Sequence, residues 1–63
     1  MIIVEYRFKN EKRFTNIAKC WLVPNCYDTV EDAMREIRKH NRGEYRIVNV
    51  DGRKRNVLVQ ISR

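Results

Sequence analysis

Apolar and polar residues partly alternate at the start of the chain, from Ile2 to Phe8. The segment is rich in β-branched and aromatic residues, and this pattern predicts a β-strand. A second strand is expected from Phe14 to Val23, although three of its residues form strands poorly. Pro24 should end that strand, because proline lacks the N–H that a β-ladder requires.

The most regular pattern is one apolar stripe at helical spacing, formed by Val30, Ala33, Met34 and Ile37. Spacings of three, four and seven residues place these side chains on one side of an α-helix. Asp28 or Thr29 can cap its N-terminus, and Gly43 can end it. The predicted helix therefore runs from about Thr29 to Asn41.

Two further apolar segments, 44–50 and 56–62, predict a hairpin around Asp51-Gly52. A two-residue turn at this dipeptide is one alternative. A longer loop over residues 51–56 would instead place Val50 opposite Val57. We expect the longer loop, because it brings apolar side chains together across the strands.

The predicted order is β-β-α-β-β in a single small basic domain over residues 1–63, an α+β fold. We expect a four-stranded antiparallel or mixed sheet with one helix packed on one face. One helix covers only one face of such a sheet. Alternation predicts that the helix meets two sets of side chains: Ile2, Val4, Tyr6 and Phe8 from the first hairpin, with Val48, Val50, Val57, Val59 and Ile61 from the second.

The other face of the predicted sheet stays uncovered and still carries large apolar side chains. They are Ile3, Ile17, Trp21, Tyr45, Ile47 and Leu58. An apolar patch of that size on a small protein marks an interface. Trp21, Tyr45, Ile47 and Leu58 are therefore candidates for contact with a partner or with a second copy in a homodimer. The alternative is a one-residue slip in strand register, which would exchange the two faces.

Charge changes the picture most. The chain has 14 Lys and Arg against 8 Asp and Glu in 63 residues, a formal net charge of +6. One cationic group lies on the predicted helix and consists of Arg35, Arg38, Lys39 and Arg42. The helix dipole alone can explain this group, because it favours cations in the last turns of any exposed helix. The other group, Arg53, Lys54 and Arg55, lies at the predicted hairpin tip, and Lys9, Lys12 and Arg13 form a second basic end.

Other chemistries find little support in the sequence. No apolar segment reaches the roughly 18 residues that a membrane span needs. Cys20, Cys26 and His40 lack the spacing and the fourth ligand of a zinc site, so no metal or cofactor is expected. A glycine-rich phosphate loop is absent, and we expect no enzyme. The N-terminus has no basic leader, which favours a cytoplasmic protein with reduced cysteines.

The leading functional prediction is a small, non-enzymatic accessory protein that binds DNA or RNA through phosphate contacts. Such contacts would come from Arg53, Lys54 and Arg55, with help from the helix cations. The alternative is a protein-binding inhibitor or antitoxin-like module that docks on an acidic or nucleic-acid-binding surface of a host protein. Size and basic composition are also typical of phage or mobile-element proteins.

Overall fold

One helix packs against one face of a four-stranded sheet in the computed structural model, which describes all residues from 1 to 63. The elements are β1 (Ile2–Arg7), β2 (Thr15–Asn16), the short 3-10 helix η1 (Ile17–Lys19), α1 (Val30–Arg38), β3 (Glu44–Asp51) and β4 (Lys54–Ser62). The strand order is β2-β1-β3-β4, and every neighbouring pair is antiparallel. The predicted α+β class and element order are confirmed.

Helix α1 begins at the predicted cap. The Thr29 hydroxyl accepts the Asp32 N–H at 3.1 Å, which satisfies one free donor of the first turn. The helix ends at Arg38, three residues before the predicted end. The chain then returns to the sheet through Gly43, which has a φ of +108°. A Cβ at this position would lie 3.1 Å from the Arg7 carbonyl oxygen, so both the backbone conformation and the space favour glycine.

The second strand is much shorter than predicted. Only Thr15 and Asn16 pair with β1, so the prediction of a strand from Phe14 to Val23 is wrong. The Asn16 side-chain oxygen accepts the Ala18 N–H at 2.9 Å and starts η1. This local bond offers the backbone an alternative to the ladder, which ends the strand.

The hairpin of β3 and β4 is tighter than predicted. Asp51 lies opposite Lys54 and Val50 opposite Arg55, so a two-residue turn at Gly52-Arg53 joins the strands. Gly52 has a φ of +61°, a conformation that tight hairpin turns require and glycine adopts easily. The predicted long loop, with Val50 opposite Val57, is therefore wrong.

A β-bulge divides β4 into two halves. Val57 lies opposite Val48, but Val59 lies opposite Ile47, so Leu58 is an extra residue in the ladder. Such an insertion changes which residues point to each face beyond it. The predicted grouping of Val57 with Val59 on one face is wrong for this reason.

The pairing of β1 with β3 decides what lies under the helix. Val4 is opposite Ile47 and Tyr6 opposite Tyr45, and opposite residues share a face. The buried core on this face consists of Val4, Tyr6, Ile17, Ala33, Ile37, Tyr45 and Ile47, with Trp21 packed against it. The prediction that Ile17, Trp21, Tyr45 and Ile47 form an open face is thus wrong. Sequence alternation separates the two faces of a single regular strand such as β1, but it does not show which face of β3 joins which face of β1.

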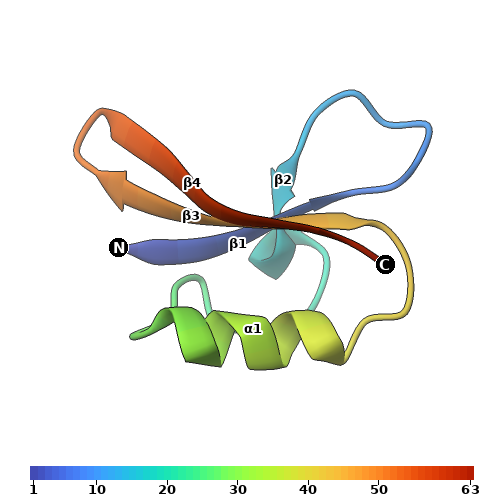
Figure 1. Cartoon of the computed structure of the whole chain (residues 1–63), viewed down its shortest axis with the longest axis horizontal. Coiled ribbons are helices and arrows are strands. Elements are labelled where there is room, and N and C mark those ends of the chain that lie inside the picture. The colour runs from blue at the N-terminus through green and yellow to red at the C-terminus, as the bar shows by residue number, and fades with distance from the viewer.

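Two segments rise from the sheet on the side away from α1 (Figure 1). One is the loop of residues 8–14 between β1 and β2, and the other is the β3–β4 hairpin over residues 51–56. We call them the first arm and the second arm, and we call the sheet face between them the arm face. They stand toward opposite ends of the longest axis, which is 29 Å.

Candidate functional site

Hydrogen bonds within the loop and from Arg7 fix the conformation of the first arm. The Glu11 N–H donates to the Phe8 carbonyl at 3.0 Å, and the Phe8 N–H donates to the Glu11 carboxylate at 3.1 Å. Arg7 adds a bond of 3.2 Å from its guanidinium to the Lys12 carbonyl. Three exposed cations, Lys9, Lys12 and Arg13, project from this loop without an acidic partner within 4.0 Å. They are therefore free to meet an anion.

The second arm presents two free cations rather than three. Arg53 in the turn and Lys54 beside it are exposed and form no ion pair. Arg55 instead folds back onto the sheet, where its guanidinium lies 2.6 Å from the Glu5 carboxylate. The three predicted tip residues thus lie together in the structure, but Arg55 is held by a partner of its own.

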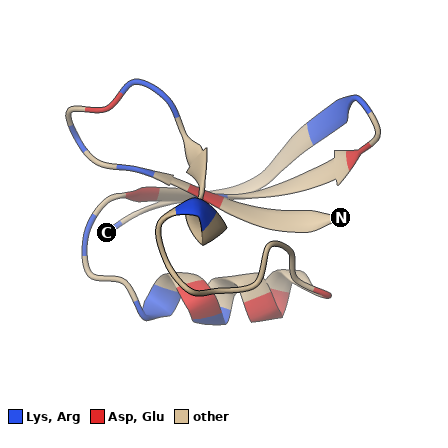
Figure 2. Cartoon of the chain, turned by 180° about the vertical axis from the view of Figure 1, so that it is seen from behind, with Lys and Arg blue, Asp and Glu red and all other residues tan.

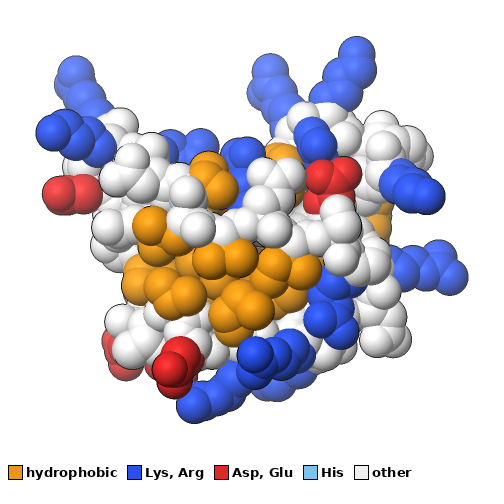
Figure 3. Space-filling view, viewed as in Figure 1, with side chains coloured by type: hydrophobic (Ala, Val, Ile, Leu, Met, Phe, Trp, Pro, Cys, Tyr) orange, Lys and Arg blue, Asp and Glu red, His pale blue; other side chains and the backbone are white.

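Both arms carry their charge to the same side of the molecule. Figure 2 shows Lys and Arg on each arm, and Figure 3 shows these side chains projecting away from the sheet. The five free arm cations are Lys9, Lys12, Arg13, Arg53 and Lys54. Their nearest acids along the chain are Glu11, which bonds its own loop, and Asp51. An anionic partner on this side would therefore meet two separate basic groups.

Glu5 forms the polar centre of the arm face. It is only 8% exposed, and its two carboxylate oxygens accept bonds of 2.9 Å from Arg46 and 2.6 Å from Arg55. These three side chains come from β1, β3 and β4, so one carboxylate ties three strands together. Charged groups buried to this degree need such partners.

Phe14 joins the first arm to this centre. The Arg46 guanidinium lies 3.9 Å from the centroid of the Phe14 ring, and that of Arg7 lies 4.5 Å from it. Both distances are typical of cation–π contacts. Arg7 also pairs with Glu44 at 3.2 Å. The base of the first arm is therefore fixed while its cationic tip stays exposed.

These contacts of Glu5 were not predicted from the sequence. Glu5 and Arg7 interrupt an apolar strand at alternate positions, which indicates a polar face, but their partners lie far away in sequence. Arg55 is 50 residues from Glu5, and Arg46 is 41 residues from it. Pattern reasoning along one strand cannot find contacts at that separation.

The helix cations lie on the other side of the sheet (Figure 2). Arg35 pairs with Asp32 at 2.9 Å, and the Lys39 ammonium is 4.0 Å from the Glu36 carboxylate. Arg38 is exposed and forms no ion pair. The two cationic groups predicted from the sequence therefore do not form one continuous surface.

Arg42 belongs to a different place again. It lines a depression of about 660 Å³ between the base of the first arm and the end of β4. Lys9 and Arg63 line the same depression, together with Phe8, Asn10, Gly43, Glu44 and Ser62. Arg42 thus adds positive charge beside the first arm rather than along the helix.

The four residues predicted as an apolar interface are placed elsewhere. Tyr45 and Ile47 are 1% and 0% exposed, respectively, and Trp21 stacks edge-on against Tyr6 with ring centroids 4.7 Å apart. Only Leu58, at the bulge, is open to solvent, with 47% of its surface exposed. The predicted apolar face of Trp21, Tyr45, Ile47 and Leu58 is therefore not open to a partner.

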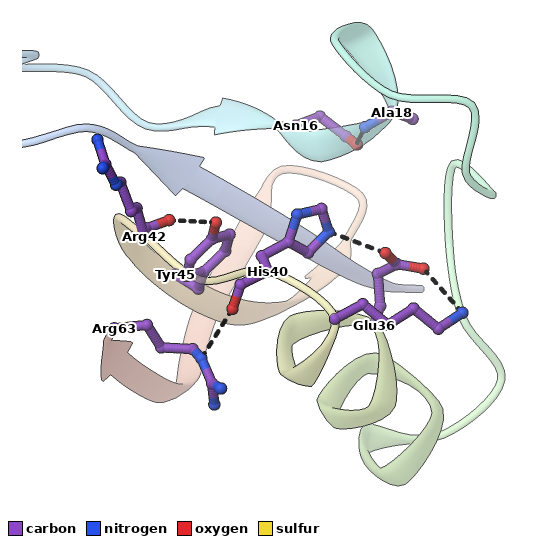
Figure 4. A network of polar contacts seen from close by, with 8 residues as sticks. Asn16, Ala18, Glu36, His40, Arg42, Tyr45 and Arg63 are labelled. Carbon is purple, nitrogen blue, oxygen red and sulfur yellow. Dashed lines mark hydrogen bonds and ion pairs between the residues drawn. The ribbon is translucent and has the colours of Figure 1, made fainter.

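Polar side chains secure the edge of this core (Figure 4). His40 contacts the Glu36 carboxylate at 2.9 Å, and its carbonyl accepts a bond of 2.9 Å from Arg63. The Tyr45 hydroxyl donates to the Arg42 carbonyl. These contacts join the end of α1 to β3 and to the end of the chain.

All three tyrosines lie on the helix side of the sheet, and each has a raised pKa. A hydrogen bond from Tyr6 to the Cys20 sulfur, at 2.9 Å, together with burial, raises the pKa of Tyr6 to about 12. Burial raises the pKa of Tyr27 to about 12 and also raises the pKa of Tyr45. The folded state therefore favours the neutral, protonated form of each tyrosine hydroxyl.

The three residues considered as zinc ligands, Cys20, Cys26 and His40, have different surroundings. Cys20 accepts the Tyr6 hydroxyl and His40 contacts Glu36, while Cys26 is an exposed free thiol. Nowhere do three His, Cys, Asp or Glu side chains gather in a group that could hold a metal ion. No helix has the length and apolar character needed to cross a membrane.

The fold and the arm face define a small α+β domain with a two-armed basic surface. No protein-family model, curated protein or solved structure matches the chain. Inference about function therefore rests on the side chains described above.

Proposed function

We propose that this protein binds nucleic acid through the phosphate backbone, with its two arms as the contact points. The observation that carries this proposal is the placement of five unpaired, exposed cations on two arms that rise from one side of the sheet. Clustered Lys and Arg side chains with no acidic partners attract phosphates over long range. The separation of the arms suits contact with phosphates at two places along a strand or across a groove.

The polar surface between the arms supports backbone contact rather than base recognition. Proteins that bind single-stranded nucleic acid stack its bases on exposed aromatic rings. Phe14, the aromatic side chain of the arm face, already lies under two guanidinium groups. We therefore propose binding with little sequence preference and a preference for duplex DNA or RNA. Non-enzymatic action and a cytoplasmic location remain predictions that go with this proposal.

The alternative drawn from the sequence, a protein-binding inhibitor or antitoxin-like module, depended in part on an open apolar sheet face. Tyr45 and Ile47, the centre of that surface, are buried beneath the helix side of the sheet. A protein partner would need a different surface.

Fluorescence anisotropy with a labelled duplex tests the proposal. The variant Arg53→Gln/Lys54→Gln removes one Arg and one Lys from the second arm. Its matched control, Arg38→Gln/Lys39→Gln, removes one of each from the far side of the molecule. For a duplex, each lost phosphate contact should lower the slope of log affinity against log salt by about 0.9.

We expect the arm variant to lose about two units of slope by that rule, and affinity to fall at least about tenfold at low salt. The control should stay within about twofold of the unaltered protein, since its residues touch no phosphate in this arrangement. Equal losses in both variants, or binding that does not weaken with salt, would overturn the proposal.

A further inference from the structure

A second surface lies along the free edge of the sheet. Strand β4 has nine residues and pairs only with β3, so its outer edge is unpaired. Helix α1 packs on β1 and β3, which leaves part of the underside of β4 uncovered. An unprotected edge of this length is a template for another strand.

An apolar ledge runs beside that edge. Val59 and Ile61 point from β4 toward the helix side, and Val30 and Met34 come from α1. All four pack against the core and are only partly buried. Figure 3 shows the resulting apolar patch between β4 and α1. Side chains of an added strand that point to the helix side would cover this ledge.

The backbone of β4 is suitably oriented at its C-terminal half. Gly43 and Arg63 exchange two N–H···O bonds, of 3.2 and 2.8 Å. Hydrogen-bonded and non-hydrogen-bonded pairs alternate in an antiparallel ladder, so Ser62 and Gln60 direct their N–H and C=O groups to the open edge. Two residues thus offer four backbone groups next to the ledge.

The N-terminal half of β4 offers a second set of backbone groups. The Val50 N–H donates to the Met1 carbonyl and so points to β1. Its partner Arg55 must then point outward, as must Val57 two residues on. The bulge at Leu58 separates this set from the first, so one straight partner strand can use only one half. The ledge favours the C-terminal half.

Positive charge lies at one end of the ledge, where α1 and β4 end. A shallow depression of about 280 Å³ on α1 is lined by Val30 and Met34 together with Glu31, Arg35 and Arg38. Glu31 lies beside Val30 at the other end, and Arg35 is paired with Asp32. Arg38 and Arg63 form no ion pair, and Arg63 uses only its Nε to bond the His40 carbonyl, so both guanidinium groups can meet an acidic group. An acidic segment would complement this end of the ledge.

A second copy of the chain fits poorly along the whole of this edge. Two full-length β4 strands paired antiparallel by a twofold axis would place Lys54 and Arg55 toward Arg63 of the other copy. Like charges held side by side across strands destabilise the pair. Charge therefore disfavours a homodimer paired along all of β4.

We propose that the edge of β4 and its ledge bind an extended acidic segment of a partner protein, which adds a fifth strand to the sheet. Apolar residues at alternate positions of that segment point to the helix side and cover the ledge, and acidic residues at the N-terminal end of this antiparallel strand meet Arg38 and Arg63. Main-chain bonds to Gln60 and Ser62 fix the register of the added strand. The proposal does not depend on nucleic-acid binding, although Ser62 and Arg63 also line the depression beside the first arm.

The probe is a capped peptide of alternating Val and Thr with two Glu at its N-terminal end, and its matched control has two Lys in their place. Amide chemical shifts report where each peptide binds the ¹⁵N-labelled protein. The acidic peptide should shift resonances of residues 58–62 and of α1 and leave those of Lys12 and Arg53 at the arm tips unchanged, and the basic peptide should bind at least tenfold more weakly. Shifts confined to the arms, or none at millimolar peptide, would overturn the proposal.

Gln60→Pro tests the main-chain bonds directly. Proline removes an outward N–H and no bond to β3, so the fold should survive while peptide affinity falls at least tenfold. Gln60→Ala keeps that N–H and should bind normally. Should Gln60→Pro not fold, Arg38→Glu provides the second test, because reversal of an exposed charge should weaken the acidic peptide tenfold without unfolding the protein. Retained binding in the folded variant, or sedimentation that shows a dimer dissociated by Gln60→Pro, would contradict an acidic partner segment.

Discussion

The two faces of the sheet are built from the same strands, but different interactions hold their side chains. On the helix face, apolar residues and three tyrosines pack under α1, and Ile37 and Ile47 are fully buried. On the arm face, Glu5 gathers two arginines while five cations on the arms stay unpaired. The helix face therefore accounts for most of the stability, and the arm face holds the charge that can act on a partner. Variants on each face should separate these two roles.

The largest difference between the helix face and the arm face is expected at high pH, because every tyrosine lies on the helix face. The pKa values of Tyr6 and Tyr27 are raised from 10.0 to about 12, and that of Tyr45 is raised as well. Neutral tyrosine is thus favoured by folding. Its contribution to stability is complete below pH 10 and is lost as the pH rises through about 12.

We expect tyrosinate absorbance and loss of circular dichroism to appear together near the raised pKa values, not near 10. Cys20→Ala removes the acceptor of the Tyr6 hydroxyl and should bring the pKa of Tyr6 down toward its ordinary value. Three tyrosines that titrate near pH 10 with the fold intact would show that the helix face is more open than described.

Truncation of Ile37 is the next largest test. This side chain is 0% exposed between α1 and the sheet, so Ile37→Ala should lower the free energy of unfolding by about 3 kcal/mol. Ile37→Val should lower it by about 1 kcal/mol. Chemical denaturation measures both changes. The folded fraction of each variant should bind duplex with unchanged affinity, and a loss beyond twofold would mean that the faces are coupled.

Much of the fold follows from local patterns in the sequence. The apolar stripe from Val30 to Ile37 and the cap at Thr29 predicted α1, because both signals lie within one element. The last two strands were also expected near their observed positions. Their register was not, because the bulge at Leu58 and the turn at Gly52-Arg53 leave no mark in the alternation of apolar residues.

The candidate site was predictable only in part, for a related reason. Exposure of Arg53 and Lys54 follows from their place at a hairpin tip. The ion pair between Arg55 and Glu5 depends on how three strands assemble. It could not be predicted, because the order of strands in a sheet is not encoded in any one segment. Sequence reasoning thus located the charge but not the contacts that leave some cations free and hold others.

Glu5→Gln should lower stability and raise duplex affinity. The carboxylate accepts bonds from Arg46 and Arg55, and its loss should lower the free energy of unfolding by about 2 kcal/mol. The same change frees two positive charges on the arm face, so duplex affinity should rise several-fold at low salt. Glu44→Gln is the control, since its partly exposed pair with Arg7 is worth only about 0.5 kcal/mol. Weaker binding by Glu5→Gln would show that the arms need the carboxylate for their position.

A small effect is expected on the helix face, at Tyr27, and its sign is opposite to that of the other substitutions there. The Tyr27 hydroxyl is buried without a hydrogen-bond partner, and burial without a partner costs free energy. Tyr27→Phe removes that oxygen, keeps the ring, and should raise the free energy of unfolding by about 1 kcal/mol. The alkaline transition should also move to higher pH, because one group of raised pKa is gone. Duplex affinity should not change, since Tyr27 lies across the sheet from the arms. Destabilisation by this substitution would mean that the hydroxyl is bonded in solution, and that the helix face contains a polar contact like those of the arm face.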